Sequence, residues 1–381
     1  MHPGDLGLRI PPVKIALLAH CHHPIAEPYS GGLETHTALV ADELVRRGHQ
    51  VDLYAKAGSR SRARVRRIVD ARFHFGSMPD AAGVDRSVTV LDRAMEMAVA
   101  HIAQGGYDVV LNNSLSPVPF RTLRDIPMLT VLHTPADLPR INAVIGAPGW
   151  WPGPAHAYAA VSEHTAQDWR AVLPAVQCIP NGIDLRRWRP DAAQRPEPGL
   201  AVWAARITPE KGLPLAIQAS RAAGMRIEIA GPIADRRHFD REVAPLLADD
   251  ARYVGHLTHG ALPKFLSRGS VFVSSPRWPE PFGLALVEAM ACGTPAAALP
   301  RGAAREVVSA AGGVLATDSS APALARAIRR AARLDRHLVR ASVLRFDHTA
   351  MVGAYEQLLT QLVAAATASP VAPIEEDALA S

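Results

Sequence analysis

The alternation of apolar runs and helical patterns near the N-terminus is the feature that most restricts how this chain can fold. Residues 13–19 form an apolar run rich in branched side chains, and residues 32–47 place apolar side chains on one helical face before Gly48. A second apolar run follows at residues 51–55. A strand, a helix and a strand in this order form a βαβ unit, in which a right-handed crossover joins two parallel strands. We therefore expect the first part of the chain to form a parallel α/β sheet.

The same alternation continues along most of the chain. A proline-rich stretch at residues 189–199 has few apolar anchors and marks a linker between two such sets. We predict two doubly wound α/β domains, residues 1–188 and 189–345, a helix over residues 346–367 that bridges back to the first domain, and a disordered tail over residues 368–381. The other strand candidates are residues 109–111, 128–132, 158–161, 200–205, 226–230, 252–254, 271–274 and 296–299, and the other helices include residues 88–102 and 213–223.

The composition is that of a soluble globular protein long enough for two domains: 381 residues, of which 48% are hydrophobic and 20% charged. The sequence contains no run of eighteen apolar residues and no apolar stretch at its start that resembles a secretory signal, so we expect a cytoplasmic protein. The three cysteines, Cys21, Cys178 and Cys292, are far apart and odd in number, which favours reduced thiols.

A short stretch carries much of the small net charge of +5, with arginines at positions 60, 62, 64, 66 and 67. We expect a solvated, partly mobile loop over Arg60–Arg67. The alternative is contact with an anionic membrane surface, a nucleic acid or an acidic acceptor. Nucleic acid is disfavoured because no aromatic residues interleave with these arginines. Peripheral contact with the inner face of the membrane is the alternative that we retain.

Two carboxylates flank a predicted helix start in the segment from Glu280 to Glu288. Pro281 is acceptable only before or within the first helical turn, so a short helix begins near Phe282 or Gly283. The free N–H groups and the positive dipole end of such a helix favour a phosphate. At ~1.5 Å per residue the carboxylates lie on the order of 10 Å apart, roughly the separation of sugar and ribose across a diphosphate. One carboxylate would accept sugar hydroxyls and the other ribose hydroxyls; two ordinary surface glutamates are the alternative.

Two cations, Arg206 and Lys211, follow the first strand of the second domain. At a strand-to-helix turn they would neutralise the charge that grows on a departing diphosphate, in place of a metal ion. No Asp-x-Asp pair is present to hold a divalent ion against phosphates. The cluster His20-Cys21-His22-His23 is a poor chelate, because neighbours on an extended segment point in opposite directions. We expect that cluster to line the cleft for the acceptor, with a zinc site as the alternative, and we predict no metal and no cofactor.

Two features of the first domain follow predicted strands, where ligands of parallel sheets bind. Gly31 and Gly32 would let the backbone approach a phosphate at a helix N-terminus, and a simple tight turn is the alternative. His133 ends the strand at residues 128–132, at the edge of a cleft between the domains. It would take part in catalysis or orient the substrate there, or serve a structural role. The pattern Gly-x-Gly-x-x-Gly is absent from this turn, which disfavours a dinucleotide cofactor.

Taken in order, these motifs resemble those of the retaining glycosyltransferases of the GT-B fold, in the large family four that includes bacterial glycan, phosphatidylinositol and natural-product glycosyltransferases. The resemblance implies two Rossmann-like domains that face each other across a cleft. Two departures are visible, Ala205 in place of a glycine often found before the arginine, and a turn at residues 231–233 without a second glycine. The motifs that carry the resemblance are Gly31-Gly32, His133, Pro180-Asn181-Gly182-Ile183-Asp184, Arg206 with Lys211-Gly212, and the E-x(7)-E pair Glu280 and Glu288.

The resemblance implies a role for each of these residues. Glu280 would contact hydroxyls of the donor sugar, and Glu288 would hold the ribose. Arg206 and Lys211 would bind the diphosphate, while His133 would orient the transferred sugar. The other donor contacts would come from Gly31 and Gly32, from the backbone around Val254 and Leu257, and from the backbone N–H groups of Phe282, Gly283 and Leu284.

We therefore predict a metal-independent glycosyltransferase that moves a hexosyl unit, with retention, from a nucleoside diphosphate sugar of the UDP or GDP type. The acceptor would be a hydroxyl on a small molecule, a glycan or a lipid-linked compound. One alternative is a sugar-nucleotide epimerase or a phosphorylase on the same fold. Another is a non-catalytic protein that binds a nucleotide sugar or a membrane surface.

Overall fold

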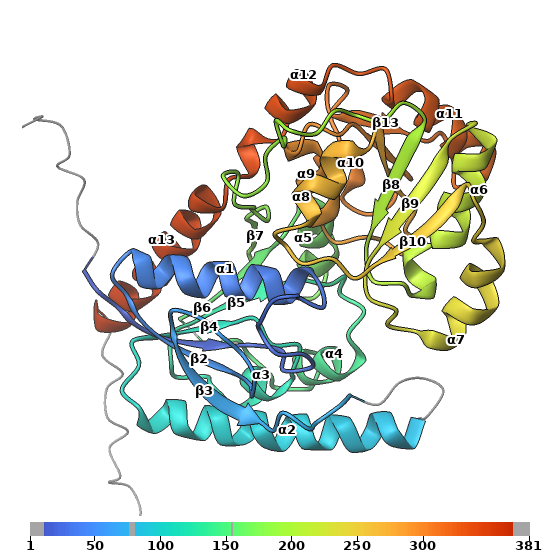
Figure 1. Ribbon diagram of the computed structural model, residues 1–381. Helices are drawn as coiled ribbons and strands as arrows, with labels where there is room; N and C mark the ends of the chain where they lie inside the picture. Colours follow the sequence, from blue (N-terminus) through green and yellow to red (C-terminus); the bar gives the residue numbers. More distant parts are fainter. Residues whose placement is uncertain (1–10, 76–80, 154, 369–381) are drawn as a thin grey trace, which may run out of the picture.

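Two parallel sheets, each flanked by helices, form the core of the computed structural model, which describes residues 11–75, 81–153 and 155–368 (Figure 1). Every strand pair within these two sheets is parallel. The first sheet contains β1 (Lys14–Leu18), β2 (Gln50–Lys56), β3 (Arg64–Val69), β4 (Val109–Asn112), β5 (Met128–Leu132), β6 (His156–Ala160) and β7 (Val176–Cys178), in the order β3-β2-β1-β4-β5-β6-β7.

The second sheet begins after the proline-rich stretch at residues 189–199, so the predicted domain boundary lies between the two sheets. Its strands follow the order β10-β9-β8-β11-β12-β13 and run as β8 (Leu200–Ala204), β9 (Arg226–Ala230), β10 (Ala251–Gly255), β11 (Val271–Ser274), β12 (Ala296–Ala298) and β13 (Gly313–Leu315). The two-domain parallel α/β fold predicted from the sequence is confirmed.

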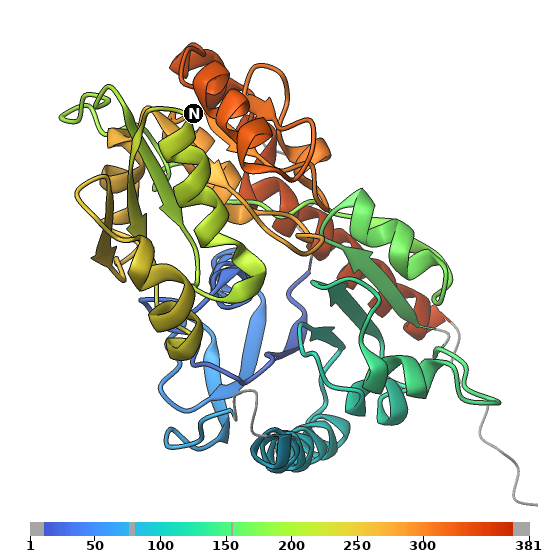
Figure 2. The same ribbon diagram turned by 90° about the vertical axis from the view of Figure 1, so that its right-hand side faces the viewer.

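Helices connect the strands in both domains (Figures 1 and 2). In the first domain they are α1 (Gly32–Arg46), α2 (Ala81–Gln104), α3 (Val118–Thr122), α4 (Pro139–Ile145) and α5 (Glu163–Arg170). In the second domain they are α6 (Leu213–Ala222), α7 (Arg236–His238), α8 (Leu262–Arg268), α9 (Leu284–Ala291), α10 (Ala304–Val307), α11 (Ala321–Ala331) and α12 (Arg336–Ala341), and α13 (His348–Ala368) ends the described chain.

Both faces of the first sheet are covered, which explains why its inner strands read as continuous apolar runs. Side chains alternate across β1. Ile15 and Leu17 join the cluster that contains Leu44 of α1 and Tyr355 of α13. Ala16 and Leu18 pack instead with Met95 and Ala98 of α2 on the opposite face. The central strands are therefore recognisable from sequence because no polar face interrupts them.

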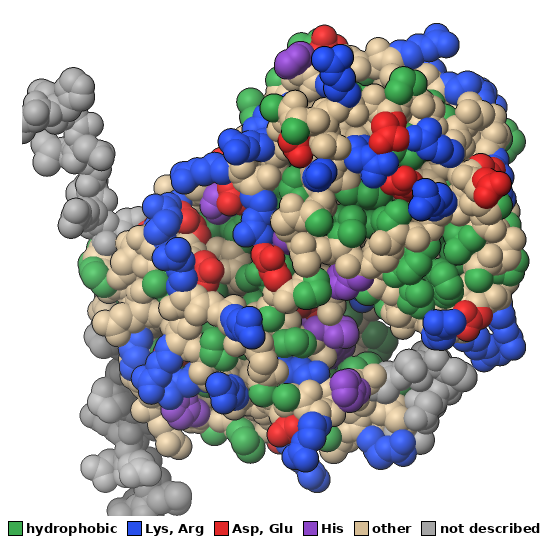
Figure 3. All heavy atoms as spheres, in the orientation of Figure 1, with side chains coloured by type: hydrophobic (Ala, Val, Ile, Leu, Met, Phe, Trp, Pro, Cys, Tyr) green, Lys and Arg blue, Asp and Glu red, His purple; other side chains and the backbone are tan. Residues whose placement is uncertain are grey.

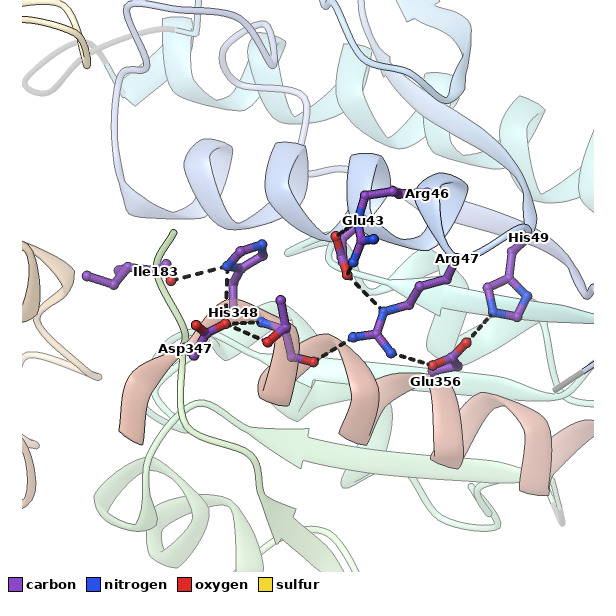
Figure 4. Close-up of polar contacts among 9 residues, drawn as sticks. Glu43, Arg46, Arg47, His49, Ile183, Asp347, His348 and Glu356 are labelled. Atoms are coloured by element: carbon purple, nitrogen blue, oxygen red, sulfur yellow. Dashed lines mark hydrogen bonds and ion pairs between the residues drawn. The ribbon is translucent and has the colours of Figure 1, made fainter. Parts of the chain in front are cut away.

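The last helix, α13, packs against α1 and against β5 and β4 of the first sheet (Figures 1 and 2). Arg47 donates hydrogen bonds to Glu356 Oε2 and to the carbonyl of Thr349, both at 2.7 Å. On the other oxygen of the same carboxylate, Glu356 Oε1 lies 2.9 Å from His49 Nε2 (Figure 4). These contacts tie α13 to the first domain. Beyond Ala368, the predicted disordered tail lies outside the described residues.

The prediction of a solvated loop over Arg60–Arg67 is wrong for its second half. Residues 64–69 form β3, an edge strand that pairs in parallel with β2. Arg66 donates to Asp52 of β2 at 2.8 Å, whereas Arg64 and Arg67 are exposed. An edge strand needs no continuous apolar run, and charged side chains protect it from pairing with other chains. That combination hides the strand from a search for apolar patterns.

None of the helices in the described ranges is long and apolar enough to cross a membrane.

Candidate active site

A cavity of about 400 Å³ lies between the two domains, next to the carboxyl ends of strands from both sheets (Figure 3). Strands β1 and β5 of the first domain lead into it, as do β8, β9 and β11 of the second. The predicted site residues that line it are Gly31, Gly32, His133, Arg206, Lys211, Leu257, Glu280, Phe282, Gly283, Leu284 and Glu288. One cavity thus brings together all the predicted site residues except Val254.

Val254 does not belong to the cavity lining. Its side chain is 37% exposed, and its neighbour Tyr253 on β10 points the other way, where the phenol donates to the carbonyl of Gly231 at 2.8 Å. Successive side chains on a strand point to opposite faces. The cavity is reached only two residues later, at His256 and Leu257.

The segment with two carboxylates contains a helix start, as predicted, one residue later than expected. Helix α9 begins at Leu284, and Gly283 precedes it with φ +90°, a backbone conformation that favours glycine. Pro281 and Phe282 lie before the helix, where a missing N–H has no cost. The N–H of Leu286 donates to the Gly283 carbonyl at 3.0 Å, whereas the N–H groups of Leu284 and Ala285, which line the cavity, have no backbone partner among the described residues. The start of α9 is therefore available to an anionic group.

Glu280 is held by two donors at the entrance to this helix. Its Oε2 accepts hydrogen bonds from Lys211 Nζ at 2.6 Å and from Trp278 Nε1 at 2.9 Å. Lys211 Nζ also lies 5.3 Å from the centre of the Trp278 ring. The backbone carbonyl of Glu280 accepts a hydrogen bond from the N–H of Ala303 at 2.9 Å. The residues predicted to bind diphosphate and sugar separately are thus ion-paired with each other, across 69 positions in sequence.

Arg206 follows β8 and reaches the first domain. A Cβ atom placed on Gly31 would lie 3.7 Å from Arg206 Nε and 3.2 Å from Glu34 Oε2, so glycine leaves room for both side chains. In the described part of the chain, Arg206 makes no ion pair. A Cβ on Gly32 would lie only 2.9 Å from Leu284 Cδ1, at the start of α9. The two glycines therefore allow the first domain to approach the predicted diphosphate site closely.

Glu288 lines the cavity from the second turn of α9. Burial raises the pKa of this carboxyl group from its ordinary value of 4.5 to about 8. It makes no hydrogen bond through its side chain to other described residues. A carboxyl group of this kind is a ready partner for hydroxyl groups that enter the cavity.

His133 follows β5 and lies on the wall opposite α9. Its ring contacts that of His36 edge to face, with centroids 4.6 Å apart. Burial, with smaller contributions from His36 and His20, holds the pKa of His133 well below its ordinary value. Its Nε2 is buried without a hydrogen-bond partner among the described residues. His133 is therefore a neutral ring with one nitrogen that no described residue satisfies.

Sequence reasoning did not assign a role to Glu34, which lines the same wall. His20 Nε2 lies 3.2 Å from Glu34 Oε1, and both side chains are buried. The histidine cluster at residues 20–23 does line the cavity through His20, His22 and His23. Over the described ranges, no group of three His, Cys, Asp or Glu side chains is arranged to hold a metal ion.

The sequence did contain one sign of the role of Glu34. This residue lies in the first turn of the helix that follows Gly31-Gly32.

Family models match both halves of the chain. A model described as Glycosyltransferase Family 4 matches residues 30–187, and one described as Glycosyl transferases group 1 matches residues 184–342. The D-inositol 3-phosphate glycosyltransferase of Xylanimonas cellulosilytica is 26% identical over 360 residues, covering 80% of this chain and 84% of the relative. The glycogen synthase of Mycobacterium tuberculosis is 34% identical over 166 residues, covering 41% of this chain and 40% of the relative.

Solved structures share the two-domain fold over nearly the whole chain. Sucrose-phosphate synthase from Thermosynechococcus elongatus gives a TM-score of 0.76 at 22% identity and covers 92% of this chain and 99% of its own. Anabaena HepE in complex with UDP and glucose gives 0.67 at 18% identity, covering 92% and 100%. The fold is thus GT-B, with two Rossmann-like domains. Together with the matches to both family models, this shows that the chain is a glycosyltransferase of the glycosyl transferases group 1 family.

Proposed function

We propose that the protein is a retaining hexosyltransferase that uses a nucleoside diphosphate hexose of the UDP or GDP type, without a metal ion. The observation that carries the proposal is that Arg206, Lys211, Glu280 and Glu288 line one cavity together with the start of α9. The solved structures of Anabaena HepE with UDP and glucose and with UDP-glucose support a nucleotide-sugar donor for this fold.

The cavity offers a different chemical group to each part of such a donor. The diphosphate would lie over the first turn of α9, where unpaired N–H groups and the helix dipole favour negative charge. Arg206 and Lys211 would bind the oxygens of the diphosphate. Lys211, which contacts Glu280 in the absence of a donor, would then share its ammonium group between Glu280 and a phosphate oxygen. Glu280 would accept hydrogen bonds from sugar hydroxyls, and Glu288 would contact the ribose.

In the proposed reaction, the bond between the anomeric carbon and the diphosphate oxygen breaks first. Its electron pair stays on the phosphate, and Arg206, Lys211 and the helix start stabilise the charge that develops there. The sugar carries positive oxocarbenium-like character at this point. The acceptor oxygen then bonds to the anomeric carbon on the face that the diphosphate leaves, and the acceptor proton passes to a phosphate oxygen. No side chain serves as a covalent nucleophile in this scheme.

A thermal-shift panel of UDP-, GDP-, ADP- and dTDP-glucose tests the donor site, because a ligand that binds the folded state raises Tm. We expect UDP- or GDP-glucose to raise Tm in the wild type and the shift to disappear in Arg206→Ala. Arg333→Ala is the matched control, since Arg333 is exposed and its side chain makes no hydrogen bond or ion pair with described residues. Release of nucleotide should persist in EDTA. No shift with any of the four, or turnover that requires Mg²⁺, would contradict the proposal.

A further inference from the structure

The wall that the first domain contributes to the cavity has no Lys or Arg side chain among the described residues. Histidines at positions 20, 22, 23 and 133 line it, together with Glu34. Figure 3 shows histidine side chains gathered in the hollow between the two domains. The cations that line the cavity, Arg206 and Lys211, both belong to the second domain. The two walls of the cavity therefore differ in charge.

The polar centre of this wall is the pair formed by His20 and Glu34. Their side chains are 8% and 4% exposed, and His20 Nε2 lies 3.2 Å from Glu34 Oε1. The ring of His22 lies against that of His20, with centroids 4.8 Å apart. The second ring nitrogen of His20, Nδ1, is buried without a partner in the described part of the chain.

Among the described residues of the first domain that line the cavity, Glu34 is the one carboxylate. Burial, assisted by the charges of His20 and His23, lowers the pKa of His22 to about 3, and burial likewise lowers the pKa values of His23 and His133. These three rings are therefore neutral. Burial works to raise the pKa of Glu34, but the hydrogen bond and charge of His20 outweigh it and hold that pKa at about 2. Glu34 is therefore ionised.

The cations of the opposite wall are already engaged when a donor is bound. Under the proposed function Arg206 and Lys211 bind the diphosphate, and Lys211 is also within 2.6 Å of Glu280. A phosphate group on the acceptor would lose water next to the Glu34 carboxylate without gaining a Lys or Arg partner. The ring that faces this carboxylate, His20, is already paired with it. Both the desolvation of the phosphate and the like charge oppose that placement.

We propose that this wall is an acceptor site for an uncharged polyhydroxyl compound, in which the His20–Glu34 pair binds acceptor hydroxyls and excludes acceptors that carry a phosphate group. The inference rests on the proposed function and names its second substrate by charge. It also distinguishes this chain from those of its relatives whose name contains a phosphorylated compound, D-inositol 3-phosphate.

Matched pairs of acceptors test the proposal in the wild-type protein. Each pair differs only by a phosphate group: myo-inositol and inositol 3-phosphate, glucose and glucose 6-phosphate, glycerol and glycerol 3-phosphate. With the donor selected by the thermal-shift panel, glycosylated product and released nucleotide are both measured. We expect at least one uncharged member to be used, with kcat/KM about tenfold or more above that of its phosphorylated partner.

Preference for a phosphorylated member would overturn the proposal. So would a failure to use any of the six compounds while the donor is still hydrolysed, since hydrolysis shows that the donor site works. The absence of both donor binding and hydrolysis is a different result, because it contradicts the proposed function itself.

The variant Glu34→Gln links the preference to the carboxylate. The substitution preserves the shape of the side chain and removes its charge. The kcat/KM of the phosphorylated acceptor, divided by that of its uncharged partner, should therefore rise about tenfold. Glu96→Gln on α2 is the matched control, because Glu96 is exposed. This control should leave the ratio of the two kcat/KM values unchanged. An unchanged ratio in a folded Glu34→Gln protein would contradict the role of the pair.

Discussion

Lys211 and Glu280 show how single residues prepare this site. They lie 69 positions apart and are joined by a hydrogen bond of 2.6 Å at the entrance to α9. The charges of the pair offset each other, and a donor could bring a phosphate to the lysine and a hydroxyl to the carboxylate. The sequence indicated both residues but gave no sign of this contact, because it depends on how two loops of the second domain fold together.

Removing each carboxylate separately should distinguish the two ends of the donor. Glu280→Ala should lower kcat on the order of 100-fold, as expected when an interaction with the reacting sugar is lost. Glu288→Ala should instead weaken nucleotide affinity about tenfold, because it removes hydrogen bonds to a part of the donor that does not react. Steady-state kinetics and UDP titration measure the two effects. Equal and negligible effects from both variants would contradict the site assignment.

The high pKa of Glu288, about 8, predicts a pH-dependent stability. An acid whose pKa is raised on folding binds its proton more tightly in the folded state, so this contribution is full below pH 4.5 and is lost as pH rises through 8. Glu288→Gln should therefore be more stable than the wild type at pH 9, on the order of 1 kcal/mol because cavity water screens the group. At pH 4 the two proteins should unfold alike.

Denaturant unfolding at the two pH values measures this difference. The exposed residue Glu96 provides the control, since Glu96→Gln should show the same stability as the wild type at both pH values. The same gain from Glu288→Gln at pH 4 and pH 9 would mean that the effect is one of packing and not of protonation.

At the scale of elements, the buried parallel strands were predictable because both of their faces are apolar. β5, β9 and β11 have the bounds expected from sequence. β3 was missed because it lies at a sheet edge with exposed arginines. Val254 was predicted as a backbone contact, and the lining of the cavity begins two residues later, at His256. Apolar patterning predicts which segments are covered on both sides; it does not predict edges or which of two neighbours faces a ligand.

The loop that contains Gly302 packs against the backbone of Glu280, just before the start of α9. Gly302 has φ +56°, and a Cβ atom there would lie 2.1 Å from the Glu280 carbonyl oxygen. Gly302→Ala should therefore cost about 3 kcal/mol of stability, from the left-handed backbone and from the clash. It should also lower kcat on the order of tenfold, because Glu280 has to move.

Gly199→Ala is the matched control for this loop. Gly199 has φ +73°, and a Cβ atom there would meet nothing within 4 Å. It should cost only about 1 kcal/mol, the price of the backbone conformation, with kcat unchanged. Thermal unfolding and kinetics of the two variants separate the effects. Equal kcat values would contradict the claim that this loop positions Glu280.

At the scale of the whole molecule, contacts across the domains fix the start of α9 against the first domain. Thr165 of α5 donates to the carbonyl of Pro281 at 3.3 Å. The carboxylate of Glu306, from the second domain, accepts from the backbone N–H groups of Glu163 and His164 at 2.8 and 2.7 Å. Such contacts depend on the placement of entire domains. The motifs of the sequence were sufficient to predict the two-domain fold, but not these contacts.

The central claim is that this cavity transfers a hexosyl unit from a nucleotide sugar with retention. Real-time NMR of the reaction, with the donor and acceptor identified above, observes the nucleotide sugar, the released nucleotide and the first glycoside together. We predict that nucleoside diphosphate appears at the same rate as a glycoside with the anomeric configuration of the donor. A first product with the inverted configuration, or an isomerised nucleotide sugar formed without release of nucleotide, would contradict the account.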